Sequence, residues 1–158
     1  MQITRQADYA VRAVIYLAER GRASPIATAE IGRQQHISQS FLAKIMSQLA
    51  AAGIVHTLRG AHGGICLGRP LEEISLLDIL ETIDGPLLLN ECVSDPSLCP
   101  LGENCAVHKV WCQAQADLVD RLSSTSMAKL VQPRARSSAP LESEPQGADP
   151  IAYTEVKI

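Results

Sequence analysis

The chain has 158 residues, of which 46% are hydrophobic and only 3% aromatic, and its net charge at pH 7 is −3. This length fits one domain with a short appendage, and the shortage of aromatic side chains predicts an aliphatic, mainly helical core rather than a β-sandwich. No apolar run approaches the roughly 18 residues that a membrane span needs, and the N-terminus lacks the apolar segment of a signal peptide. We therefore expect a cytoplasmic protein with no membrane partner.

The charge is unevenly distributed along the chain. Residues 1–70 carry eight Lys and Arg against three Asp and Glu, whereas residues 71–158 carry six against fourteen. A basic half on an acidic protein is typical of a nucleic-acid-binding module joined to a second function.

Three short helices are predicted in the basic half. Apolar residues at helical spacing predict a helix over residues 7–18, with Thr4 as its N-cap. Thr28 and Ser38 are the predicted N-caps of two further helices, over residues 29–35 and 39–52, and Gly53 ends the last of them. Two short helices joined by a tight turn form a helix-turn-helix.

A β-hairpin is predicted directly after these helices. Residues 54–58 and 65–67 are predicted to be two strands, and the glycine-rich segment 59–64 joins them. A hairpin in this position is the wing of a winged helix, and its tip can approach a phosphate backbone or a minor groove. The candidate DNA contacts are the start of the recognition helix and the wing: Ser38, Gln39, Ser40, Phe41, Lys44, Arg59 and Gly60. The alternative for the helix residues is a solvated, capped helix start.

The acidic half begins with a capped helix. Ser75 and Asp78 have the spacing of a capping box. A long helix is predicted over residues 105–124, where apolar residues recur every three or four positions. A helix of about 20 residues spans about 30 Å, so we interpret it as a dimerisation helix, the alternative being ordinary packing within its own domain. The expected organisation is a DNA-binding region (1–70), a region with the capped helix, a cofactor loop and the dimerisation helix (71–130), and a disordered or loosely attached tail (131–158).

Three cysteines and a histidine crowd into the stretch 92–108 and predict a metal or iron–sulfur site. Cys92, Cys99, Cys105 and His108 are separated by prolines and a glycine that favour a looping backbone. The donor set alone leaves structural zinc open. The cysteine count of five is odd, which argues against a closed set of disulfides. Of the two cysteines outside the set, Cys66 lies in an apolar run, and Cys112 follows His108 by one helical turn.

The order of these parts resembles the Rrf family of bacterial transcriptional regulators, which includes the IscR and NsrR types. The matching segments are Thr4-x-x-x-Asp8-Tyr9-Ala10-Val11, Ile37-Ser38-Gln39-Ser40-Phe41-Leu42, Val55-x-x-x-Arg59-Gly60-x-x-Gly63-Gly64 and the Cys92, Cys99, Cys105 set. The resemblance covers about residues 1–130. It implies a homodimeric winged-helix repressor or activator, not an enzyme, whose affinity for a double-stranded DNA operator depends on an iron–sulfur cluster.

The resemblance leaves the fourth cluster ligand open. In the IscR type, three cysteines and a histidine hold a 2Fe–2S cluster, which implies Cys92, Cys99, Cys105 and His108 here and is the favoured assignment. The spacing between Cys92 and Cys99 is one residue longer than is usual in that type. In the NsrR type, a nitric-oxide sensor, the matching carboxylate is Asp8 of the partner subunit and the cluster is 4Fe–4S. The remaining alternative is a zinc-stabilised or clusterless module that binds DNA or protein.

Overall fold

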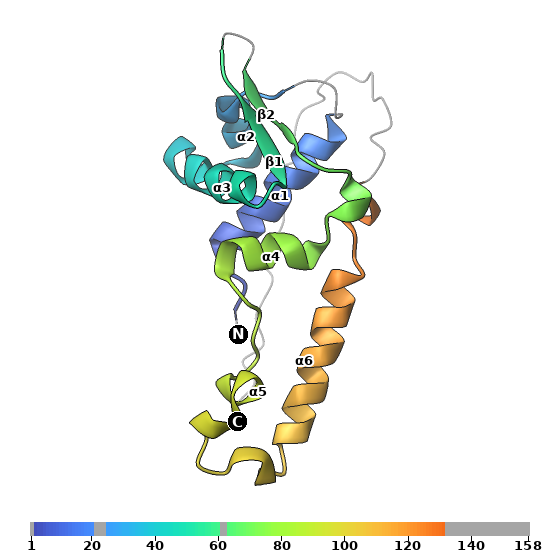
Figure 1. Cartoon of the computed structure of the whole chain (residues 1–158). Coiled ribbons are helices and arrows are strands. Elements are labelled where there is room, and N and C mark those ends of the chain that lie inside the picture. The colour runs from blue at the N-terminus through green and yellow to red at the C-terminus, as the bar shows by residue number, and fades with distance from the viewer. Residues whose placement is uncertain (1, 21–24, 61–62, 132–158) are drawn as a thin grey trace, which may run out of the picture.

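The computed structural model describes residues 2–20, 25–60 and 63–131. Within these ranges the chain is mainly helical with one two-stranded antiparallel sheet, which confirms the predicted winged-helix class. A head containing α1–α4 and the sheet occupies one end of the molecule, and α6 extends away from it (Figure 1). The predicted tail lies, beyond Val131, outside the described residues.

Helix α1 (Arg5–Glu19) is the centre of the head. The Thr4 side chain caps it as predicted, because its hydroxyl oxygen accepts a hydrogen bond from the Ala7 amide at 3.1 Å. Small side chains let the neighbouring helices α2, α3 and α4 approach its buried face closely. The fully buried residues on this face are Ala7, Ala10, Ala13 and Val14.

The helix-turn-helix consists of α2 (Thr28–Gln35) and α3 (Gln39–Ala51). The turn is tight because His36 adopts a left-handed conformation (φ 54°) and the Ile37 amide donates to the Gly32 carbonyl at 2.8 Å. A Cβ on Gly32 would lie 2.8 Å from the Ile37 carbonyl oxygen, so this approach requires glycine.

The predicted N-cap of α2 was wrong by one residue. Ala27, not Thr28, occupies that position, and its backbone is extended. The helix begins one residue earlier than predicted, because the Ile31 amide donates to the Ala27 carbonyl at 3.2 Å. The preceding Ile26 pairs with Ile65 of the wing through two hydrogen bonds of 2.9 and 2.8 Å, which hold the chain extended before the helix.

The wing is the hairpin of β1 (Val55–Leu58) and β2 (Gly64–Leu67), with Val55 opposite Leu67 and Leu58 opposite Gly64. Gly64 is required where Ile26 joins the sheet, because a Cβ there would lie 2.6 Å from the Ile26 carbonyl oxygen. The hairpin projects from the side of the head opposite α6 (Figure 1).

Helix α4 (Leu76–Asp84) closes the other side of the head. The predicted capping box is present, with Ser75 and Asp78 each accepting from the other's amide at 3.0 and 2.8 Å. At the other end of α4, the Asp84 carboxylate accepts bonds from the Thr4 amide and hydroxyl. Thr4 therefore caps α1 and also ties it to α4.

The chain then leaves the head through α5 (Glu91–Ser94) and returns along α6 (His108–Ser123). The long helix was predicted to start at Cys105, but it starts three residues later. A 3₁₀ turn over Gly102–Asn104 precedes it, and the backbone of Cys105 is extended (ψ 123°). This difference places Cys105 in the loop and His108 at the first position of the helix.

The end of α6 returns to the core of the head. Met127 is fully buried, its amide donates to the Ile74 carbonyl at 2.8 Å, and the Leu76 amide donates to the Thr125 carbonyl at 2.8 Å. Side chains therefore pack continuously across residue 70, where the DNA-binding region was expected to end. The division into a DNA-binding and a cofactor-binding region stays a prediction. None of the described helices is both long and apolar enough to span a membrane.

Candidate DNA-binding surface and cysteine loop

The N-terminal end of α3 presents polar side chains to solvent. Ser38, Gln39, Ser40 and Lys44 are all exposed. Ser38 occupies the predicted N-cap position, but its side chain makes no capping hydrogen bond. Backbone N–H groups at a helix N-terminus attract phosphate, so this end of α3 has the chemistry of a recognition helix.

Phe41 differs from its neighbours on α3. Its ring is half-buried and meets the Tyr9 ring of α1 edge-on, with 5.9 Å between the ring centroids. This contact fixes the position of α3 against α1. A contact between Phe41 and DNA stays a prediction.

The wing carries the other predicted contacts. Arg59 and Gly60 are both exposed at the end of β1, and Gly60 has a φ of 112° that favours glycine. A Cβ on Gly63 would lie 2.3 Å from the Leu58 carbonyl oxygen, so the turn is tight at this point as well. The turn therefore requires glycine at both position 60 and position 63.

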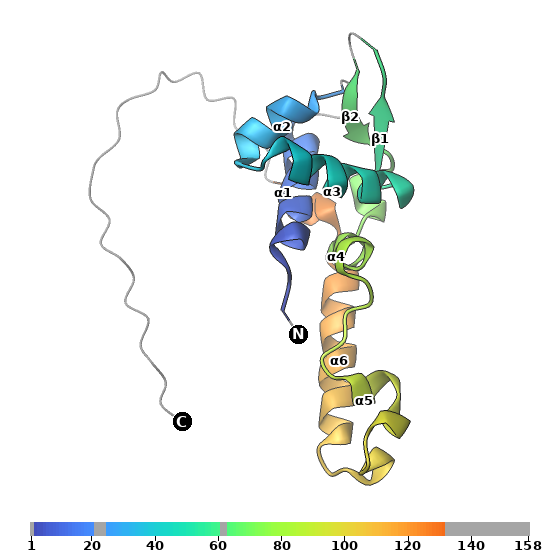
Figure 2. The same cartoon turned by 90° about the vertical axis from the view of Figure 1, so that its left-hand side faces the viewer.

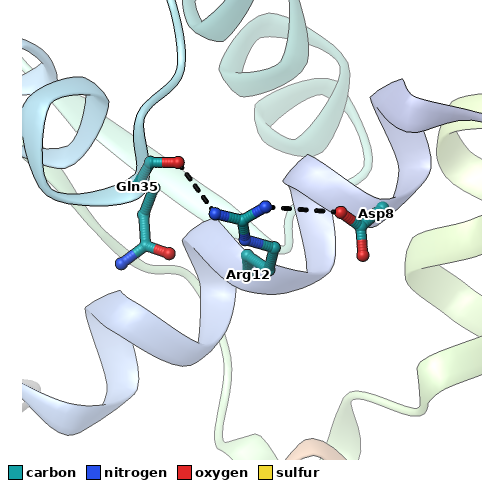
Figure 3. Close-up of polar contacts among 3 residues, drawn as sticks. All are labelled: Asp8, Arg12 and Gln35. Atoms are coloured by element: carbon teal, nitrogen blue, oxygen red, sulfur yellow. Dashed lines mark hydrogen bonds and ion pairs between the residues drawn. The ribbon is translucent and has the colours of Figure 1, made fainter. Parts of the chain in front are cut away.

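Arg12 belongs to α1 and links that helix to the helix-turn-helix (Figure 3). Its guanidinium lies 3.5 Å from the Asp8 carboxylate and also donates to the Gln35 carbonyl at 2.9 Å. Gln35 is the last residue of α2, where carbonyls lack partners within the helix. Sequence reasoning missed this bond, because its acceptor is a main-chain atom that any residue would supply.

A second bond links α1 to α2. The Tyr16 hydroxyl donates to the Glu30 carboxylate at 3.0 Å. Burial and this carboxylate both raise the pKa of Tyr16, so the phenol keeps its proton and remains a donor. Together with Arg12, this contact holds the helix-turn-helix in one orientation on α1.

The cysteine loop, residues 92–105, lies beside the end of α6 that is remote from the head (Figures 1 and 2). Between Cys92 and Cys99 the chain turns at Asp95, whose carboxylate accepts from the Ser97 amide at 3.0 Å and hydroxyl at 2.6 Å. These bonds lower the pKa of Asp95. Past Cys99, the Gly102 amide donates to the Cys99 carbonyl at 2.9 Å and turns the chain again.

The loop brings two of the predicted ligands together. Cys92 and Cys99 line one pocket of about 240 Å³, whereas Cys105 and His108 lie at the start of α6, where the His108 amide donates to the Cys105 carbonyl. All three thiols are half-buried and unpaired. In the described part of the chain, no three His, Cys, Asp or Glu side chains gather closely enough to hold a metal ion.

His108 has one engaged ring nitrogen and one that lacks a partner. Its Nε2 lies 3.4 Å from the Cys112 sulfur, one helical turn further along α6. Its Nδ1 is buried and has no hydrogen-bond partner among the described residues. A buried nitrogen without a partner is costly, and a ligated metal would satisfy it. The donors present, three thiols and an imidazole with a free nitrogen, therefore fit an iron–sulfur cluster or a zinc ion.

Part of the apolar stripe of α6 is left exposed by the described residues. No residue of this helix is fully buried, and Val110 and Trp111 are 59% and 39% exposed. A shallow groove of about 400 Å³ runs along the same helix and is lined by Lys109, Val110, Gln113, Ala114 and Asp117.

Comparison with known proteins identifies the family. The model of the Rrf2 family, described as an iron-dependent transcriptional regulator, matches residues 3–133. The chain is 35% identical over 136 residues to protein aau3 of Rhizobium meliloti, covering 85% of this chain and 87% of that protein. It is 30% identical over 131 residues to the HTH-type transcriptional regulator IscR of Photorhabdus laumondii, covering 83% and 79%.

A solved structure agrees with these relatives. CymR, the global cysteine regulator of Bacillus subtilis, matches with a TM-score of 0.70 and 26% identity, covering 82% of this chain and 95% of that one. The chain belongs to the Rrf2 family of transcriptional regulators. The predicted family and the prediction of a DNA-binding regulator rather than an enzyme are thereby confirmed.

We expect Arg59→Ala to weaken operator binding and to lower the slope of log affinity against log salt by about 1, because one phosphate contact is lost. The measurement is a salt titration of binding by fluorescence anisotropy. Arg121→Ala is the matched control, since it removes an exposed positive charge from α6 outside the groove. Unchanged affinity and slope in Arg59→Ala would remove Arg59 from the interface.

Proposed function

We propose that this chain is a homodimeric transcriptional regulator whose affinity for a double-stranded DNA operator is set by an iron–sulfur cluster. Cys92, Cys99, Cys105 and His108 would hold it, as a 2Fe–2S cluster of the IscR type. The observation that carries the proposal is the combination of three unpaired, half-buried thiols in one loop with the partnerless Nδ1 of His108. The family's description as iron-dependent supports it.

The choice of ligands has a chemical consequence. When bound, such a cluster supplies a redox-active centre, and an imidazole in place of a thiolate raises its potential. The four donors come from the loop and from the first turn of α6, so holding them together requires the loop to fold onto that end of the helix. The segment that leads into the loop is already bonded to α6, since the Gln115 amide oxygen accepts from the Leu89 amide at 2.8 Å.

Helix α6 gives the loop a route to the DNA-binding end. The C-terminal end of α6 is anchored in the head by Met127, while its N-terminal end carries His108 and the exposed apolar stripe. If two copies pair along this stripe, a change at His108 alters how the two helices meet. That change would alter the separation of the two heads, and hence of the two recognition helices on a pseudo-palindromic operator.

The NsrR-like alternative has its own supporting observation. Asp8 is exposed and its partner is Arg12, which also holds the last carbonyl of α2 (Figure 3). Recruitment of Asp8 to a 4Fe–4S cluster of the partner subunit would withdraw the carboxylate from Arg12. The signal, nitric oxide in that type, would then act on the helix-turn-helix directly rather than through α6.

A zinc-stabilised or clusterless module is the remaining alternative. The metal-free form of this module is favoured by the absence, among the described residues, of any three donors gathered closely enough for a metal. The similarity to CymR, described as a cysteine regulator, is compatible with control by other means. Colour separates these cases, because a zinc-bound or metal-free protein is colourless.

The first prediction of the proposed function concerns the three cysteines of the loop. We expect the anaerobically purified chain to absorb visible light, and each of Cys92→Ala, Cys99→Ala and Cys105→Ala to lose that absorption, because each removes one thiolate ligand. Cys66→Ala is the control, since its thiol lies in β2 within the head, and should keep full absorption. Iron and zinc analysis of the same samples completes the test, and full cluster occupancy in Cys99→Ala would contradict the assignment.

The second prediction separates the two candidate fourth ligands. We expect His108→Ala to change the absorption and EPR spectra after anaerobic reconstitution, and Asp8→Ala to leave both spectra as in the wild type. If only Asp8→Ala altered the cluster spectrum, the 2Fe–2S assignment would fall and a 4Fe–4S sensor of the NsrR type would replace it.

The third prediction concerns the dimer. We expect Val110→Glu to give a monomer in sedimentation equilibrium, because it places a charge in the exposed apolar stripe. Operator affinity should fall by roughly a hundredfold, since each head then binds one half-site without a tethered second one. Ala116→Glu adds the same charge at an exposed position of α6 outside the groove and should remain dimeric. A dimeric Val110→Glu would exclude this surface.

A further inference from the structure

Cys112 lies outside the proposed ligand set, yet among the described residues its sulfur is the one side-chain hydrogen-bond partner of the proposed ligand His108. The Cys112 sulfur is 3.4 Å from Nε2, a usual distance for an N–H···S hydrogen bond. Both residues belong to α6 and are four positions apart, so the helix itself holds the pair in register. The other ring nitrogen, Nδ1, is buried without a partner.

These two observations select a tautomer of the neutral imidazole. With the proton on Nδ1, a buried N–H has no acceptor, and Nε2 is left with only the weak S–H group as a donor. With the proton on Nε2, that N–H donates to the sulfur, and the buried Nδ1 presents a lone pair. The second arrangement satisfies the stronger donor, so it is the favoured one.

We propose that Cys112 is a positioning residue for His108: its sulfur accepts the Nε2 proton, fixes the tautomer, and leaves Nδ1 as the atom that binds the cluster. Histidines that bind metals commonly donate their other ring N–H to such a partner, which orients the ring. The inference rests on the proposed function in naming the cluster as the ligand of Nδ1. The tautomer itself is a property of the cluster-free chain.

Direct ligation by Cys112 is the competing role for this thiol. It would require the sulfur to turn from the ring, and both ring nitrogens would then lack partners. Cys112 also stands on the regular part of α6, one turn beyond His108, whereas Cys92, Cys99 and Cys105 belong to the loop. The sulfur is therefore better placed to hold the ring than to replace it.

The tautomer can be measured without any cluster. Long-range ¹H–¹⁵N correlation spectra of the full cluster-free chain, labelled in its histidine rings, distinguish the two tautomers at about pH 8, where histidine side chains are ordinarily neutral. We expect His108 to be protonated on Nε2 in the wild type and in Cys112→Ser, which keeps an acceptor. Cys112→Ala should lose this preference. Exposed His36 and His56 provide internal references in the same spectra.

A second readout uses the loaded protein. The rate of cluster loss to a chelator should rise about tenfold or more in Cys112→Ala and less in Cys112→Ser, while Cys66→Ala should match the wild type. Circular dichroism confirms that each variant keeps its helices.

The outcomes separate this inference from the proposed function. A wild-type chain that binds no cluster but protonates Nε2 removes the cluster function and leaves the positioning of His108 standing. Protonation of Nδ1 in the wild type, an unchanged tautomer in Cys112→Ala, or identical behaviour of the Ser and Ala variants overturns the positioning role, whether or not a cluster binds.

Discussion

The burial of Met127 in the head determines the layout of the rest of the molecule. Its side chain is fully buried, and its amide is bonded to Ile74 at the entrance to α4. This contact anchors one end of α6, and a straight helix of 16 residues must then place its other end well away from the head. The cysteine loop lies at that remote end. Any influence of the loop on DNA therefore has to pass along α6, through the segment 85–90 that joins α4 to α5, or across to another subunit.

Helix α1 collects the contacts through which such an influence would reach the recognition helix. Arg12 holds the end of α2, Tyr9 supports Phe41 of α3, and Thr4 is bonded to Asp84 at the end of α4. Because the buried face of α1 consists largely of alanines, these neighbours pack on its backbone at short range. The head is consequently one closely packed unit, which suits a regulator that works by changing the separation of two heads.

Local chemistry was sufficient to predict most of the head. The capping pairs at Thr4 and Ser75 and the glycines of the wing follow from rules that act over a few residues, and the structure contains them. The pairing between Ile26 and Ile65, almost 40 residues apart, holds the chain extended before α2 and was not predicted. The start of α6 was misplaced because a 3₁₀ turn competes successfully with the helix before His108. Neither feature is visible in local propensity.

The sequence by itself determined the family, the order of the elements and the types of donor atoms, because motif spacing and side-chain chemistry are written into the chain. It also offered Cys112 only as a neighbour of His108 by helical spacing. The tertiary structure decided which atoms lack partners, that the loop lies far from the recognition helix, and that Arg12 bonds to a main-chain carbonyl. These features depend on burial and on backbone atoms common to all residues, so no pattern of side chains could specify them.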